Sequence, residues 1–139
     1  NLNIASRISN RALAVGREIS AAPLTVVVLD AGGHMISLQR EDGASLLRPQ
    51  IAIGKAWGAL ALGKGSRLIA ADAQQRPAFI GAVNNLADGQ LVPAPGGVLI
   101  RDERGEVIGA VGISGDTGEV DEECALAAIE AHLRSGASS

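Results

Sequence analysis

The chain has 139 residues and a formal net charge of −3 at pH 7, and 47% of its residues are hydrophobic although Trp57 and Phe79 are its only aromatic ones. This composition predicts one folded domain over residues 1–139, because disordered chains carry too little apolar surface to offset the entropy lost on folding. The 12 basic residues form no long run, which argues against a nucleic acid partner, and no uncharged apolar stretch approaches the ~20 residues of a membrane-spanning helix.

The first half of the chain predicts a helix, a hairpin and a second helix. Apolar residues spaced three and four apart predict an amphipathic helix over residues 3–21. The β-branched run 24–29 predicts a strand covered on both faces, and the turn 30–33 joins it to a return strand at 34–40. A helix of small and apolar residues is expected over 49–63, since proline is tolerated in a first turn.

The second half predicts one or two short helices over 66–86, broken before Pro77. Acidic residues after Asp116 favour the start of a last helix, because the helix dipole attracts them there. The strands expected between these helices cover 90–93, 98–101 and 107–114. The predicted fold is α+β, with a five-stranded antiparallel sheet flanked by helices in the order α-β-β-α-α-β-β-β-α.

Lys55 is the one interior charge of the second helix, where it lies among Ala, Gly and Ile. Such a lysine either extends from the edge of a buried face or presents its ammonium to a pocket, where it would pair with a carboxylate. Possible partners at strand ends and loops include Asp30 and Asp116, and Arg40 lies in a similar position. Lys55 or one of these aspartates is therefore a candidate general base.

Two turns offer further candidates for ligand binding. Pro95-Gly96-Gly97 precedes a predicted strand, and its backbone N–H groups could face an anion. His34 follows a Gly-Gly turn, which is a position where a side chain is usually exposed and able to contact a ligand such as haem.

Nucleophilic and metal chemistry have weaker candidates. Cys124 lies among acidic residues that raise a thiol pKa, so we expect a small buried core residue. His34 and His132 are far apart in sequence and outside any zinc motif, so no metal site is predicted. A single cysteine and a start without an apolar leader favour a cytoplasmic protein.

Five motifs in register give the sequence a resemblance to a known family. They are 28–33 (VLDAGG), 40–43 (REDG), 53–56 (IGKA), 91–98 (LVPAPGGV) and 108–115 (IGAVGISG), the last followed by Asp121-Glu122. Over about residues 5–133, the chain resembles the HbpS/GlcG-like family of haem-degrading domain proteins, which includes the C-terminal domain of PduO-type cobalamin adenosyltransferases.

The resemblance implies a profilin-like fold, homo-oligomers of two or more copies and, in some members, haem or corrinoid binding. Because tyrosine is absent, the possible axial haem ligands are His34, Met35, Cys124 and His132. The leading hypothesis is a binding module for haem or a related anionic small molecule, accessory to a catabolic pathway. The candidate cofactor-binding residues are His34, Arg40, Lys55, Pro95, Gly96 and Gly97.

Two other hypotheses remain open from the sequence. The chain could be a cofactor-independent enzyme of a small hydroxy- or oxo-acid, with Lys55, Asp30 and Asp116 as its catalytic residues. It could also be a structural partner of a catabolic complex. The small-residue helix face around Gly54 and Gly58 is a candidate contact with a second copy.

Overall fold

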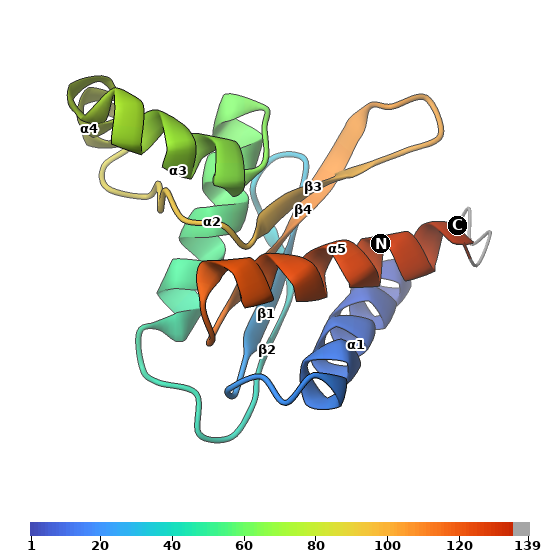
Figure 1. Cartoon of the computed structure of the whole chain (residues 1–139). Coiled ribbons are helices and arrows are strands. Elements are labelled where there is room, and N and C mark those ends of the chain that lie inside the picture. Colours follow the sequence, from blue (N-terminus) through green and yellow to red (C-terminus); the bar gives the residue numbers. More distant parts are fainter. Residues whose placement is uncertain (135–139) are drawn as a thin grey trace.

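A computed structural model describes residues 1–134 of the chain (Figure 1). Four strands form one antiparallel sheet in the order β2-β1-β4-β3. The elements in chain order are α1 (Leu2–Glu18), β1 (Thr25–Asp30), β2 (Met35–Arg40), α2 (Arg48–Leu62), α3 (Ser66–Gln75), α4 (Pro77–Leu86), β3 (Gly97–Arg101), β4 (Val107–Ser114) and α5 (Gly118–Arg134). The α+β class and the antiparallel pairing are confirmed.

The expected five-stranded sheet is wrong for the described residues, because 90–93 forms a loop instead of a strand. The backbone N–H of Leu91 donates to Asn84 Oδ1 at the end of α4, and the N–H of Val92 donates to the carbonyl of Gly54 in α2. Pro93 has no N–H to offer a neighbouring strand. The observed order is therefore α-β-β-α-α-α-β-β-α, and the profilin-like topology stays a prediction.

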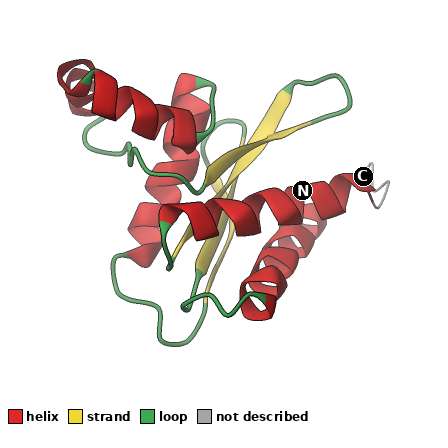
Figure 2. Ribbon diagram, in the orientation of Figure 1, coloured by secondary structure: helices red, strands yellow, loops and turns green. Residues whose placement is uncertain are grey.

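Helices cover both faces of the sheet, as the ribbon shows (Figure 2). Helices α1 and α5 pack on the face that carries Val26, Val28, Val111 and Ile113. Helix α2 packs on the opposite face, which carries Val27, Leu29 and Ala110. Alternate residues of β1 therefore enter two different cores, which explains why almost the whole strand is buried.

The helix α2 approaches the sheet closely because its contact residues are small. A Cβ atom at Gly112 of β4 would collide with the carbonyl oxygen of Ala52. On another side of α2, added Cβ atoms at Gly54 and Gly58 would collide with the side chains of Val92 and Leu91. The small-residue face expected to contact a second copy is therefore covered by the 90–92 loop of the same chain.

Helices α3 and α4 extend beside the sheet and share a small core of their own, formed by Ile69, Ile80 and Leu91. The break between them falls at Arg76, directly before Pro77. The expected break before Pro77 is confirmed. Phe79 of α4 is half exposed, and the Cζ atom of Arg76 lies 4.7 Å from the centre of its ring.

Candidate functional site

An apolar groove runs along α2 on the side away from the sheet centre. It encloses about 330 Å³ between the helix and the loop that follows α4. Its lining residues are Gln50, Ile51, Ile53, Gly54, Trp57, Gly89, Gln90 and Val92. Helix α2 has a proline in its first turn and ends at Gly63, which has the left-handed C-cap conformation (φ 71°). Ile53 and Trp57 are four residues apart and therefore lie one turn apart on the groove side.

The β1–β2 turn lies beside this groove. Asp30 Oδ1 accepts hydrogen bonds from the backbone N–H of Gly32 (2.9 Å) and of His34 (3.0 Å). The bond from His34 is the main cause that holds the pKa of Asp30 below its usual value. Gly33 has φ 84°, and a Cβ there would stand 3.2 Å from the Trp57 ring. The turn is thus packed against the aromatic side chain that lines the groove.

The imidazole of His34 extends from this turn into solvent, with 83% of its side chain exposed. Its Nδ1 lies 3.4 Å from Asp30 Oδ1, which leaves Nε2 as the nitrogen that can meet a ligand. A carboxylate beside one ring nitrogen is the usual arrangement by which proteins orient a metal-binding imidazole. Asp30 and His34, two of the predicted site residues, are therefore neighbours in space.

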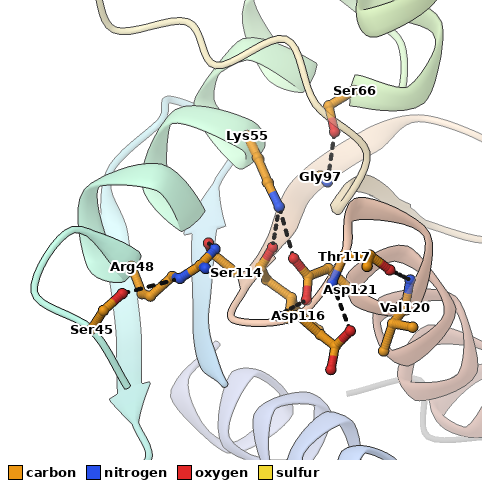
Figure 3. Close-up of polar contacts among 11 residues, drawn as sticks. Ser45, Arg48, Lys55, Ser66, Gly97, Ser114, Asp116, Thr117, Val120 and Asp121 are labelled. Atoms are coloured by element: carbon orange, nitrogen blue, oxygen red, sulfur yellow. Dashed lines mark hydrogen bonds and ion pairs between the residues drawn. The ribbon is translucent and has the colours of Figure 1, made fainter. Parts of the chain in front are cut away.

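Lys55 lies in a buried polar cluster at the other end of the sheet (Figure 3). Its ammonium donates to Asp121 Oδ2 at 3.0 Å and to the carbonyl oxygen of Ile113 at 2.9 Å, and 3% of the residue is exposed. Burial lowers the pKa of Lys55, while the Asp121 carboxylate opposes this shift by favouring the charged form. The predicted carboxylate partner exists, but it is Asp121 instead of Asp30 or Asp116.

Asp116 touches this cluster through its backbone. Its N–H donates to Asp121 Oδ1 at 2.9 Å. Its own carboxylate accepts the N–H groups of Ala22 and Thr117, both at 2.7 Å. The bond from Ala22 is the main cause that holds the pKa of Asp116 below its usual value. Asp116 thus ties the start of α5 to the segment before β1.

The Pro95-Gly96-Gly97 turn packs on the same cluster. The N–H of Gly97 donates to Ser66 Oγ at 2.7 Å, and a Cβ at Gly97 would collide with the carbonyl of Lys55. Gly96 has φ 128°, and Pro95 lies against Gly118. The glycines therefore permit a close approach to α2, and the Gly97 N–H expected to face an anion already has a partner.

The predicted site residues accordingly divide into three places. His34 and Asp30 lie at the β1–β2 turn, and Lys55, Asp116 and residues 95–97 lie around Asp121. Arg40 lies apart, where it donates to the carbonyl of Ala44 at 3.1 Å and lines a hollow with Arg17 and Glu41.

Sequence reasoning misses the groove around Trp57 and the role of Asp121. The spacing of Trp57 on its helix indicates a core residue, and Asp121 is one of several acidic residues at a helix start. The sequence does contain a signal for such a partner, because a lysine buried within an apolar helix needs a carboxylate nearby to compensate its charge.

Cys124 is fully buried, and burial together with Glu123 raises the pKa of its thiol to about 11. Within residues 1–134, no three His, Cys, Asp or Glu side chains are grouped so as to hold a metal ion. No helix in that part of the chain is long and apolar enough to cross a membrane.

Several solved structures share this fold. ORFY from Klebsiella pneumoniae superposes with a TM-score of 0.87 at 27% identity, covering 96% of this chain and 90% of ORFY. The PduOC:heme complex superposes with a TM-score of 0.84 at 25% identity, covering 94% of this chain and 93% of PduOC. HbpS gives a TM-score of 0.82 at 21% identity, covering 94% of this chain and 88% of HbpS, and supports the fold alone.

Sequence relatives agree with these structures. An uncharacterised 15.0 kDa protein of the dhaT–dhaS intergenic region of Citrobacter freundii is 30% identical over an alignment of 139 positions, gaps included, which covers 93% of this chain and 96% of the relative. The corrinoid adenosyltransferase PduO of Citrobacter freundii is 30% identical over 121 residues, which cover 87% of this chain but 36% of PduO. Residues 1–130 match the family described as haem degrading protein HbpS-like, and the chain belongs to this HbpS-like family.

Proposed function

We propose that this protein binds haem, or a related flat macrocycle, at the groove beside α2. The observation that carries the proposal is the packing of Gly33 against Trp57, because it brings the turn that carries the exposed His34 to the edge of an apolar groove. The PduOC:heme complex, which has the same fold, supports haem as the ligand class.

The residues present fit such a group in their chemistry. A haem site needs an apolar slot and an axial ligand, and the groove supplies Ile53 and Trp57 while His34 supplies an imidazole. The groove volume of about 330 Å³ is near the lower end of the usual range for small-molecule sites, about 300–1,000 Å³. The groove would therefore cover one edge of a macrocycle and leave the rest to solvent or to a second copy.

Among the four axial candidates, the geometry favours His34. Cys124 is fully buried and keeps its proton, so its sulfur is a poor ligand. Met35 is half exposed and follows His34 on β2, where it is the reserve candidate. His132 lies on α5, across the sheet from the groove. When bound, haem would supply a one-electron redox centre, and Asp30 would hold the imidazole that meets it.

We also propose that the protein is accessory to a catabolic pathway. It would act there as a homo-oligomer. Leu46, Leu47 and Leu86, which are 88%, 66% and 87% exposed, support the oligomer, because large apolar side chains in water favour association. The PduO relative also makes a corrinoid the second ligand to test.

The experiment is a haemin titration of the full chain, followed by the Soret band. The wild type should give a saturable shift at tens of micromolar, and His34→Ala should weaken the affinity by about tenfold or more and change the band position. Alanine keeps the backbone N–H that Asp30 accepts, so the turn should survive the substitution.

The matched control is His132→Ala, which removes the other histidine and should leave the spectrum unchanged. A wild type without any Soret shift overturns haem binding itself. A shift that His34→Ala leaves unaltered overturns the assignment of the axial ligand and of this groove.

The alternative enzyme receives less support from this arrangement. Lys55 is enclosed and already paired with Asp121, and Asp30 lies at the far end of β1 from Asp116. The five residue steps from Thr25 to Asp30 span about 17 Å. This distance is too long for Asp30 and Asp116 to act on one substrate atom.

A further inference from the structure

The hollow that Arg40 lines lies where the end of α1 meets the end of β2, and it encloses about 500 Å³. The residues that line it are Arg17, Pro23, Arg40, Glu41 and Asp42. Three of them belong to the motif 40–43 (REDG), which the proposed haem site does not use. The volume lies within the usual range for small-molecule sites, about 300–1,000 Å³. The motif therefore borders a space that can hold a small molecule.

One pair of opposite charges in the hollow is satisfied within the protein. Arg17 Nε lies 3.2 Å from Glu41 Oε2, and Arg17 Nη2 donates to the carbonyls of Ala21 (2.6 Å) and Ala22 (3.0 Å). Glu41 Oε1 accepts the N–H of Leu24 at 2.8 Å. Backbone atoms thus hold both members of the pair, and their charges cancel each other in the wall of the hollow.

A second pair of opposite charges lines the hollow without such partners. Within residues 1–134, neither Arg40 nor Asp42 forms an ion pair, although they are two residues apart. In that part of the chain, the Arg40 side chain makes one hydrogen bond, from Nη1 to the carbonyl of Ala44 at 3.1 Å, so its Nε and Nη2 donors stay free. The same space therefore meets one unpaired cation and one unpaired anion.

The loop that carries these two groups is held in place. The N–H of Ala44 donates to the carbonyl of Glu41 at 3.1 Å, which closes the turn 41–44. Gly43 has φ 88°, a conformation that favours glycine, and a Cβ there would stand 3.5 Å from Pro23. A ligand would meet a backbone that is already ordered, which lowers the entropy lost on binding.

We propose that this hollow binds the zwitterionic end of an α-amino acid. The free Nε and Nη2 donors of Arg40 match the two oxygens of a carboxylate, because a guanidinium can donate to them through two parallel bonds. The Asp42 carboxylate would accept from the ammonium group on the neighbouring carbon. A ligand with a single charge would satisfy only one of the two side chains. The hollow shares no lining residue with the groove beside α2.

Three compounds with matched carbon skeletons test both charges. L-Alanine, propionate, which lacks the ammonium group, and ethylamine, which lacks the carboxylate, are each titrated into the full chain at low salt, with calorimetry as the readout. L-Alanine should bind saturably with a Kd of about 1 mM or below, and the other two should bind at least about tenfold more weakly. Absence of saturable L-alanine binding, or equally tight binding of either analogue, overturns the proposal.

Two variants test the roles of the two side chains. Arg40→Lys keeps the charge but loses the planar fork, and it should weaken L-alanine binding by about tenfold. Asp42→Asn should lower the affinity for L-alanine to that for propionate, because the ammonium group loses its charged partner. The matched control is Arg104→Lys, in the β3–β4 turn, which should bind like the wild type. All three side chains are exposed, so far-UV circular dichroism should show the wild-type fold. An equal loss in Arg104→Lys, or no loss in Asp42→Asn, overturns the proposal.

Discussion

The two faces of strand β4 differ in side-chain size: branched side chains point toward α1 and α5, whereas small ones point toward α2. Val111 and Ile113 of β4 point to the first face, and Ala110 and Gly112 point to the second. On the first face, the branched side chains of β4 separate its backbone from α1 and α5, whose own buried residues include several alanines. On the second face, Ala110 and Gly112 let the backbone of α2 contact the backbone of β4 directly.

The two layers are also joined by a buried ion pair. Among residues 1–134, the buried charged side chains are Lys55 of α2 and Asp121 of α5. Their ion pair runs past the end of β4, where Lys55 also holds the carbonyl of Ile113. The α2 layer is thus joined to the opposite layer by a polar contact as well as by the sheet, and each layer should respond differently to mutation.

The largest expected effect comes from adding one methyl group to the tightly packed face. In Gly112→Ala the new Cβ meets the Ala52 carbonyl, and neither backbone can yield without moving α2. We expect a loss of more than about 4 kcal/mol in the free energy of unfolding, or no folded protein. Urea unfolding followed by far-UV circular dichroism measures it.

The adjacent residue provides the matched comparison on the other face. Val111→Ala creates the same residue type on the same strand but removes volume from a fully buried position. Its cost should be about 2 kcal/mol, because it leaves a small cavity without a collision. Equal losses in the two variants would contradict the difference in packing between the faces.

A smaller effect is expected from the ion pair that joins the layers. Lys55→Met leaves the Asp121 carboxylate buried and uncompensated, which should cost about 3–5 kcal/mol. Lys55→Met/Asp121→Asn removes that charge while keeping an oxygen for the N–H of Asp116. The double variant should recover at least about 1 kcal/mol by the same unfolding measurement.

A double variant no more stable than Lys55→Met would show that the uncompensated Asp121 carboxylate is not the cause of the loss in Lys55→Met. The same variants also examine the enzyme alternative. If Lys55 were a general base, its loss would abolish turnover in a protein that still folds.

The sequence predicts the layers well and the site less well, for physical reasons that particular residues illustrate. The run 24–29 predicts a strand covered on both faces, because every position except Thr25 is apolar and positions 25–28 are β-branched, and β1 is nearly all buried. The run 90–93 also predicts a strand, yet the N–H groups of Leu91 and Val92 bond to α4 and α2. Local composition cannot distinguish these outcomes, because they depend on which backbone groups lie nearby.

The same limit applies to the candidate site. Asp30 and His34 can be placed together from the sequence, since they are four residues apart across a Gly-Gly turn. Lys55 and Asp121 are 66 residues apart, and their pairing depends on how α2 and α5 meet at the end of β4. The Trp57 groove depends on a loop whose composition predicts a strand. Short-range chemistry is therefore predictable, whereas contacts between layers are not.

The smallest expected effect concerns one rung of the sheet on the α2 face. Thr25 and Ser114 are register partners on β1 and β4, and both side chains are fully buried. Ser114 Oγ accepts a hydrogen bond from Arg48 at 3.0 Å, whereas Thr25 Oγ1 has no hydrogen-bond partner among the described residues. Replacing a buried hydroxyl that lacks a partner by a methyl group of similar shape removes a desolvation cost.

Thr25→Val should therefore raise the free energy of unfolding by about 1 kcal/mol, and Ser114→Ala should lower it by about 1 kcal/mol. Thermal unfolding at one protein concentration compares the two. A loss in Thr25→Val as large as that in Ser114→Ala would mean that the threonine hydroxyl is paired in solution, with an ordered water as the simplest partner. In that case the α2 face would contain a hydrated site at the rung where Arg48 meets β4, and its close packing would end before Thr25.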